Sequence, residues 1–332
     1  MYFLKRSLWM IPTLIGIVTI TFFLTRLRPD PVAQKGLNPD AMQENSAAAQ
    51  HLEQLKEYYG YDKPLIVQYG KMWKNILTLD FSNSRIDHRP VLEKLIEALP
   101  YTLTLNIITV IIVYLISIPL GVYSALHDGS KTDSMITFLL YLLYSLPSFW
   151  IALLLLKYFA GGDFLNFFPL GGWQSDYADD LNFFQKIGDI AWHLFLPIVV
   201  SVYGSFAFLS RFIKSSLLEA LRSEYIRTAK AKGLSQRRVI YVHALRNSLI
   251  PLITLMAGLL PGLFGGSVIL EQIFSIPGMG KLAYDSIYAN DDPVIIAIVL
   301  FSAILTMLGI LLTDFVYTLV DPRISFSESE SK

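Results

Sequence analysis

The chain has 332 residues, of which 53% are hydrophobic and only 16% are charged, and its mean hydropathy is +0.48. A soluble domain carries roughly 25% charged residues, so this composition excludes an ordinary water-soluble protein and favours one embedded in a membrane. The formal net charge is zero and indicates no partner, and without cysteine these residues can form no disulfide, thiolate metal site or cysteine nucleophile.

Six stretches without ionised side chains are long enough to cross a bilayer, which takes about 20 residues of helix. The first follows Lys5 and Arg6, but its apolar run exceeds the roughly 7–15 residues of a secretory signal. No small-residue cleavage motif follows it, so we expect a retained first span. The six predicted spans are 7–25, 98–126, 134–156, 190–210, 247–270 and 293–313. They predict an all-α polytopic membrane protein.

Residues 28–97 are polar enough to fold in water and are predicted to form a small extracytoplasmic subdomain between the first two spans. They contain a helical-looking stretch at 47–58 and Trp73, which argue against a disordered linker. We therefore expect residues 1–97 to form the first span with this subdomain, 98–324 a five-span core, and 325–332 a tail.

Basic residues accumulate between the fourth and fifth spans, in residues 211–246. Lys and Arg concentrate in short cytoplasmic loops, so this loop is expected inside and both termini with it. Attraction to anionic lipid is expected of such a surface. The loop carries Arg211, Lys214, Arg222, Arg227, Lys230, Lys232, Arg237, Arg238 and Arg246, against only Glu219 and Glu224.

No catalytic or metal-binding pattern is recognisable. The histidines are scattered, and the stretch 275–282 lacks the first glycine and the final Ser or Thr of a phosphate-binding loop. Ionisable groups within spans mark ion-coupled transporters, but His193, Lys157 and Asp314 lie near span ends, where interfacial or local helix contacts explain them. We expect no catalytic residue, metal or cofactor in this chain.

Small residues recur in the fifth span, where Gly258, Gly262 and Gly266 are spaced by four, with Pro261 among them. Such a face allows close helix–helix approach. It is compatible with packing inside the chain and equally with a subunit interface or a moving gate.

The stretch EYIRTAKAKGLSQRRVIYVHALRNSLIP (224–251) predicts a helical hairpin. A helical pattern that begins at Ile213 places Leu217, Leu221, Tyr225 and Ala229 on one side. Gly233 can adopt positive φ at a helix end, and Ser235 can cap a second helix whose apolar flank includes Val239, Val242, Leu245 and Leu249. A loop that only attracts lipid needs neither this glycine nor an apolar pattern on two sides, and nucleic-acid binding is not expected. Docking to a soluble partner explains both the glycine and the apolar pattern.

The stretch 224–251 resembles the cytoplasmic loop of ABC-importer permeases, in which Glu-Ala-Ala is followed by three residues and Gly. With Gly233 as that glycine, the triplet falls on Arg227, Thr228 and Ala229, of which only Ala229 fits. This departure is typical of the dipeptide, oligopeptide and nickel permeases. Further similar stretches occur at 11–32, 59–69, 99–105, 146–150, 168–173, 268–287 and 321–324.

This resemblance implies a permease subunit of the bacterial inner membrane. It would pair with a second homologous permease, two cytoplasmic ATPases that bind ATP and Mg²⁺, and an extracytoplasmic solute-binding protein. The implied ATPase-coupling loop comprises Glu224, Arg227, Thr228, Ala229, Lys232, Gly233, Leu234 and Ser235. Short peptides are the expected cargo, with nickel, glutathione or oligosaccharides as alternatives. A secondary transporter would need carboxylates near the membrane midplane, and an intramembrane enzyme would need a nucleophile paired with a base. The sequence presents neither.

Overall fold

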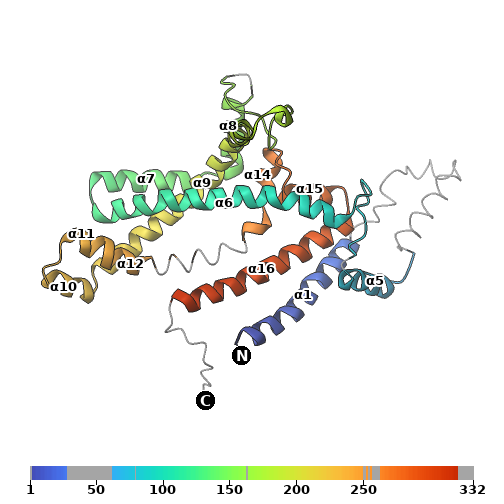
Figure 1. Cartoon of the computed structure of the whole chain (residues 1–332), viewed down its shortest axis with the longest axis horizontal. Coiled ribbons are helices and arrows are strands. Elements are labelled where there is room, and N and C mark those ends of the chain that lie inside the picture. The colour runs from blue at the N-terminus through green and yellow to red at the C-terminus, as the bar shows by residue number, and fades with distance from the viewer. Residues whose placement is uncertain are drawn as a thin grey trace, which may run out of the picture. The chain divides into compact units, whose positions relative to one another are not determined.

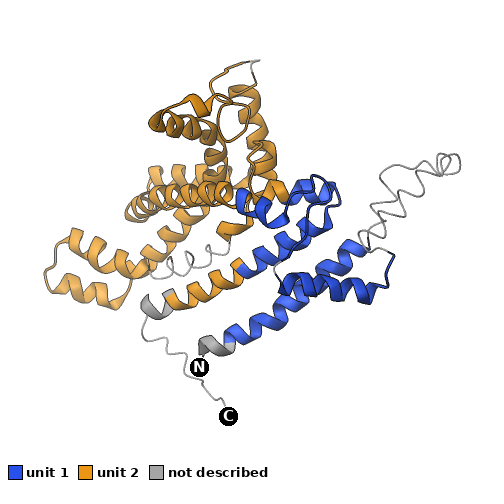
Figure 2. Cartoon of the chain, turned by 45° about the vertical axis from the view of Figure 1, so that its right-hand side comes forward, with its two compact units in different colours: residues 1–97, 283–304 blue, residues 98–282, 305–332 orange. Residues whose placement is uncertain are grey.

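The computed structural model describes residues 2–27, 62–78, 80–161, 164–249, 252, 255 and 262–320. Within these ranges the chain is helical, apart from turns and one antiparallel bridge between Asn83 and Pro90. It divides into two compact units, residues 1–97 with 283–304 and residues 98–282 with 305–332 (Figure 2). The predicted core of 98–324 therefore differs from the second unit, because residues 283–304 group with the first.

Among the residues that the structure describes, four helices are long and apolar enough to cross a membrane, namely α1 (Tyr2–Arg26), α6 (Val91–Leu126), α9 (Phe183–Leu221) and α16 (Asp292–Val320) (Figure 1). A fifth span results if α7 (Lys131–Ser145) and α8 (Ser148–Phe159) are taken together. These helices lie where five of the six apolar stretches predicted them. Residues 247–270 are described only in part, so the sixth span stays a prediction.

In the first unit, α1 packs against α5 (Leu65–Leu77) through aromatic side chains. Tyr69 of α5 lies with its ring centroid 5.4 Å from that of Phe22, and its hydroxyl is 2.8 Å from Thr19 Oγ1. Trp73 contacts Tyr69 edge-on at 6.2 Å, so this residue is part of packed structure. The predicted helix at 47–58 lies outside the described residues.

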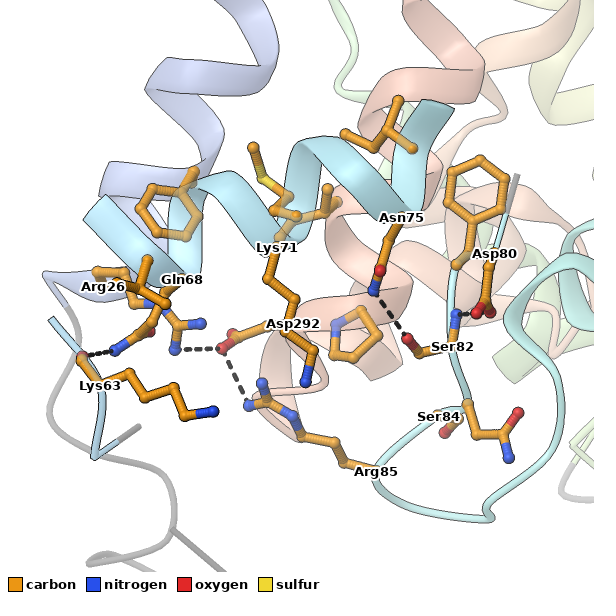
Figure 3. Close-up of a pocket in the computed structure, with 18 of the residues that line it drawn as sticks. Arg26, Lys63, Gln68, Lys71, Asn75, Asp80, Ser82, Ser84, Arg85 and Asp292 are labelled. Atoms are coloured by element: carbon orange, nitrogen blue, oxygen red, sulfur yellow. Dashed lines mark hydrogen bonds and ion pairs between the residues drawn. The ribbon is translucent and has the colours of Figure 1, made fainter. Parts of the chain in front are cut away.

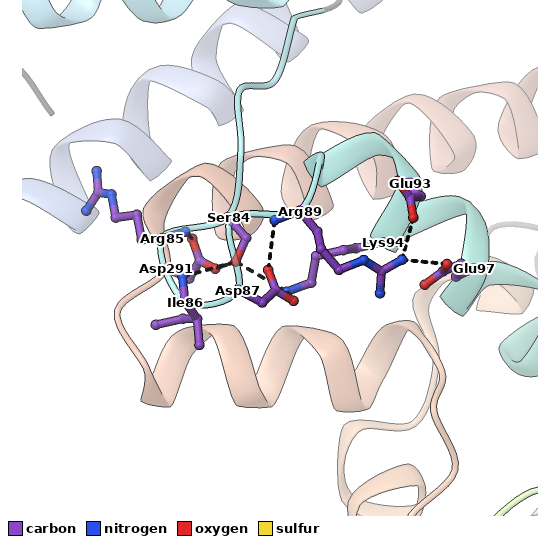
Figure 4. A network of polar contacts seen from close by, with 9 residues as sticks. All are labelled: Ser84, Arg85, Ile86, Asp87, Arg89, Glu93, Lys94, Glu97 and Asp291. Carbon is purple, nitrogen blue, oxygen red and sulfur yellow. Dashed lines mark hydrogen bonds and ion pairs between the residues drawn. The ribbon is translucent and has the colours of Figure 1, made fainter. Parts of the chain in front are cut away.

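A polar network holds the loop between α5 and α6 to the start of α16 (Figure 4). The Ser84 hydroxyl and the Arg85 backbone N–H both donate to the Asp291 carboxylate. Nearby, Lys94 Nζ donates to Asp87 at 2.8 Å. Burial alone would raise the pKa of Asp87, but the hydrogen bond and charge of Lys94 and the hydrogen bond from the Arg89 backbone N–H lower it to about 2. These contacts explain why the beginning of the last helix groups with the first unit.

In the second unit, α7 and α8 meet at a 92° bend. Pro147 lies at the N-cap of α8 and has no N–H to continue the helical ladder. The hydroxyl of Tyr203, on α9, donates to the carbonyl of Leu146 at 2.7 Å and so satisfies one group that the bend exposes. Tyr203 also belongs to a buried cluster with Leu105, Ala152 and Phe274.

Candidate functional site

The predicted hairpin forms at the end of α9. After a break at Arg222 and Ser223 come α10 (Glu224–Ala231), a turn and α11 (Gln236–Arg238). A π-helix, η2 (Val239–Ala244), and α12 (Leu245–Ser248) then follow directly. In both Figure 1 and Figure 2 the pair α10 and α11 lies at one end of the second unit.

Gly233 has φ +75, which confirms the predicted positive backbone angle at the turn. Its N–H donates to the Lys230 carbonyl at 3.0 Å, and the N–H of Leu234 donates to the Ala229 carbonyl at 3.4 Å. This pair of bonds is the Schellman motif, in which glycine occupies the left-handed position after a helix. A Cβ at Gly233 would meet no atom within 4 Å, so backbone conformation rather than space requires glycine here.

The underside of the hairpin is anchored in the core. Ile226 is fully buried, Ala229 is 8% exposed, and both belong to one apolar cluster with Leu217 of α9 and Val122 of α6. Each fully buried aliphatic side chain stabilises a fold by roughly 1.5–3 kcal/mol. The hairpin is therefore packed against two of the spanning helices.

The opposite side of the hairpin is exposed. Arg227 and Glu224 form an ion pair of 2.8 Å whose side chains are 75% and 82% exposed, so the pair adds little to stability. Thr228, Lys232 and Ser235 are also exposed. Of the eight residues of the predicted coupling loop, Ala229 is buried, Leu234 is half-buried, and the other six face outward.

Two side chains predicted on the packed face of the hairpin are exposed, Tyr225 by 40% and Val242 by 50%. The prediction extended one helical register from Ile213. The chain instead breaks before Glu224, which turns Ile226 inward in place of Tyr225. The π-helix then adds a residue per turn and rotates Val242 out of line. The Ser235 side chain occupies the predicted N-cap position but makes no capping bond.

A charged anchor on the same unit was missed by the sequence reasoning. Lys214 of α9 contacts both carboxylate oxygens of Asp133 at 2.8 and 2.6 Å, and Asp128 at 2.9 Å. The side chains of Lys214 and Asp133 are only 12% and 6% exposed. In the sequence, Lys214 indicates only the orientation of the loop. No local pattern pairs Lys214 with acidic residues about 80 positions earlier.

Next to Lys214 along α9, at Ser210 and Ile213, α6 approaches α9 closely through Gly121. A Cβ at Gly121 would lie 2.7 Å from both Ile213 Cβ and the Ser210 carbonyl oxygen. Only glycine fits this crossing, because real side chains do not tolerate contacts under 3.0 Å with backbone. The two helices that carry the hairpin are thus held at a fixed distance.

Glu271, on α14 (Val268–Ile273), is a second residue that sequence reasoning missed. It is 0% exposed and accepts hydrogen bonds from Thr102 Oγ1 at 3.0 Å and from the backbone N–H of Lys281 at 3.0 Å. Thr102 in turn accepts from the N–H of Met279, which begins α15 (Met279–Tyr288). A Cβ at Gly278 would lie 2.5 Å from Glu271 Oε2. The glycine-rich stretch after α14 therefore encloses a buried carboxylate.

The four residues predicted to form a helix-packing face or gate are Gly258, Pro261, Gly262 and Gly266. Gly258 and Pro261 lie outside the described residues. Gly262 is helical, and a Cβ there would meet nothing within 4 Å. Gly266 has φ +65 and follows the end of that helix, so the prediction that it continues the same small-residue face is wrong. A Cβ at Gly266 would lie 2.7 Å from Glu271 Oε1, which ties this glycine to the buried carboxylate.

Within the described ranges, no group of three or more His, Asp or Glu side chains could hold a metal ion. His193 makes the expected local helix contact, since its Nδ1 lies 2.9 Å from the Asp189 carbonyl oxygen and 3.6 Å from its carboxylate.

Comparison with known proteins identifies relatives along almost the entire chain. It is 38% identical to an oligopeptide transport system permease protein of Bacillus subtilis, over 98% of this chain and 99% of the relative. It is 38% identical to a dipeptide transport system permease protein of Lactococcus lactis, over 97% and 98%. A peptidoglycan transport system permease protein of Agrobacterium fabrum is 33% identical over 99% of both chains. Residues 117–326 match the family model of binding-protein-dependent transport system inner membrane components. With this match and these relatives, the chain belongs to the family of binding-protein-dependent transport system inner membrane components, the permease subunits of ABC importers.

Proposed function

We propose that this chain is the permease subunit of an ATP-driven importer of short peptides in the cytoplasmic membrane. The relatives named for oligopeptides and dipeptides, which match over nearly their full length, support this substrate class. The family is one of transport subunits, and ATP hydrolysis belongs to separate proteins. The relative named for peptidoglycan makes larger peptide-containing fragments the second candidate cargo.

The proposed partners are a second permease, two cytoplasmic ATPases that bind ATP and Mg²⁺, and an extracytoplasmic solute-binding protein. The hairpin of α10 and α11 is the proposed contact with an ATPase, and its orientation requires both termini in the cytoplasm. The observation that carries this assignment is the two-sided hairpin: Ile226 and Ala229 are packed into the core, while Arg227, Thr228 and Lys232 face outward. A force on the outer side would be transmitted directly to α6 and α9.

The transport function is tested by reconstituting the chain with its co-encoded partners in vesicles and measuring uptake of labelled dipeptides and longer peptides. We expect uptake that requires ATP and the binding protein, and weaker or no uptake of nickel, glutathione or oligosaccharides. Uptake driven by a proton or sodium gradient without ATP would instead identify a secondary transporter.

The hairpin contact and the orientation can be tested together, because the sequence contains no cysteine and a single introduced one reacts alone. We expect Lys232→Cys to be shielded from a maleimide when the ATPases are bound. Tyr177→Cys, at a side chain that is 61% exposed in the loop before α9, is the control. It should react with an impermeant maleimide from outside, with or without ATPases. Equal labelling of Lys232→Cys in both states would refute the contact.

A further inference from the structure

A half-open cavity of about 730 Å³ lies in the first unit (Figure 3). Its walls come from the end of α1, from α5, from the loop at 80–88 and from the beginning of α16. None of these residues belongs to the hairpin or to its core.

The cavity contains an excess of positive charge. Arg26 and Arg85 both pair with Asp292, at 3.6 and 3.0 Å, and their side chains are only 15% and 11% exposed. Lys63 and Lys71 add two ammonium groups to the lining. In Figure 3 the Lys71 side chain reaches down into the cavity toward Arg85.

The acidic lining residues do not balance this charge. Asp292 already faces two guanidinium groups, and Asp80 accepts a hydrogen bond from the backbone N–H of Ser82 at 3.1 Å. In the part of the chain that the structure describes, Lys63 and Lys71 make no ion pair. A negatively charged group that enters the cavity would therefore be attracted by at least two uncompensated cations.

The cavity also lies at the level where two spans end. Arg26 is the last residue of the apolar span of α1, and Asp292 is the first residue of the span of α16. Phe22 and Ile296, each about one turn inside these spans, contribute an apolar wall. At such a boundary the hydrocarbon core of a bilayer gives way to its headgroups.

Helix α5 adds a second indication of contact with lipid. Leu65, Ile66 and Val67 are 52%, 76% and 47% exposed, whereas Tyr69 of the same helix packs against Phe22 of α1, and Trp73 packs against Tyr69. A short helix with exposed aliphatic side chains beside lysines is typical of one that lies in the membrane interface.

We propose that this cavity binds the headgroup of an anionic phospholipid, with its phosphate between Lys71 and Arg85 and its acyl chains beside the apolar residues of α1 and α16. A soluble anion would leave the apolar wall and the exposed aliphatic residues of α5 unexplained. An acidic protein surface would have to enter a recess that also presents Phe22, Met72 and Ile76. An anionic amphiphile matches the charged and the apolar parts together.

The experiment uses the assembled transporter in vesicles of phosphatidylcholine with phosphatidylglycerol, followed by detergent extraction and native mass spectrometry to count retained phosphatidylglycerol. The test variant is Lys71→Gln. The matched control is Lys74→Gln, which removes the same charge from the same helix but does not line the cavity. A lysine near an anionic headgroup contributes about 1 kcal/mol, so we expect Lys71→Gln to lower retention about fivefold. We expect Lys74→Gln to leave it unchanged.

Three results would overturn the proposal. Equal retention in Lys71→Gln and wild type would exclude the site. Displacement of phosphatidylglycerol by inorganic phosphate would identify a soluble-anion site instead of a lipid site. Unchanged lipid retention together with a salt-dependent loss of binding-protein affinity in Lys71→Gln would assign the cavity to a protein contact.

Discussion

Replacement of Gly233 by alanine is the sharpest test of the hairpin. At φ +75 an L-residue costs roughly 1–2 kcal/mol relative to glycine, and the surrounding space is open, so the whole penalty comes from the backbone. A cost of about 1 kcal/mol opens the Schellman turn about fivefold more often. We expect hydrogen exchange of residues 224–238 to accelerate by that factor, and the peptide imported per ATP hydrolysed to fall.

Gly129 provides a matched control for this experiment. It has φ +76 in the turn between α6 and α7, and a Cβ there also meets nothing within 4 Å. Gly129→Ala should therefore cost the same backbone energy without changing the ratio of transport to ATP hydrolysis. Equal uncoupling by both substitutions would mean that general instability, and not the hairpin, explains the loss.

The order of substitutions at Gly233 tests the physical reasoning itself. Asparagine tolerates the left-handed region better than alanine, although it is larger. In the isolated permease we expect Gly233→Asn to destabilise the turn less than Gly233→Ala, and Gly233→Val to destabilise it most. If alanine were tolerated better than asparagine, side-chain size rather than backbone conformation would govern the turn.

Three further substitutions probe the packing and the polar contacts. Gly121→Ala should lower thermal stability by about 1–3 kcal/mol, because the new methyl group meets Ile213 at 2.7 Å. Gly204→Ala on α9, which has open space around it, should not lower the stability. Equal melting temperatures of the two variants would refute the close crossing. Glu271→Gln should destabilise by about 1–3 kcal/mol in the same melting assay, because its amide group cannot accept all the N–H donors that face the carboxylate, and an unchanged melting temperature would contradict this. The pKa of Asp87 is lowered in the folded state, so its contribution to stability is complete above its ordinary value of 3.8 and is lost as pH falls through about 2. The stability difference between wild type and Asp87→Asn should therefore shrink across that interval, and a constant difference would contradict the assignment.

Hydrophobic length and periodicity predicted most of the fold. Apolar stretches of about 20 residues coincide with α1, α6, α9 and α16. A segment buried in lipid or in the protein core must satisfy its backbone hydrogen bonds internally, and a continuous helix does this in both surroundings. The positive φ of Gly233 could also be predicted, since a Schellman turn depends on residues that are adjacent in sequence. Local rules succeed where the structure is decided locally.

The errors have a common physical origin. Tyr225 and Val242 were predicted on the packed face because a 3.6-residue period cannot register the break before Glu224 or the π-helix at Val239–Ala244. The bond between Thr102 and Glu271 joins residues 169 positions apart, and the contacts of Lys214 with Asp133 join residues 81 apart. Such contacts depend on tertiary packing, for which a single sequence carries no periodic signal.

The 92° bend between α7 and α8 has a consequence for biosynthesis. With 15 and 12 residues, each half is too short to cross a bilayer on its own. Neither half can then serve as an independent insertion signal during translation. The Leu146 carbonyl at the bend finds its donor, the Tyr203 hydroxyl, only after α9 has been synthesised. The hydrogen bond at the bend can therefore form only once the following helix is present, so the order of translation becomes part of the folding pathway.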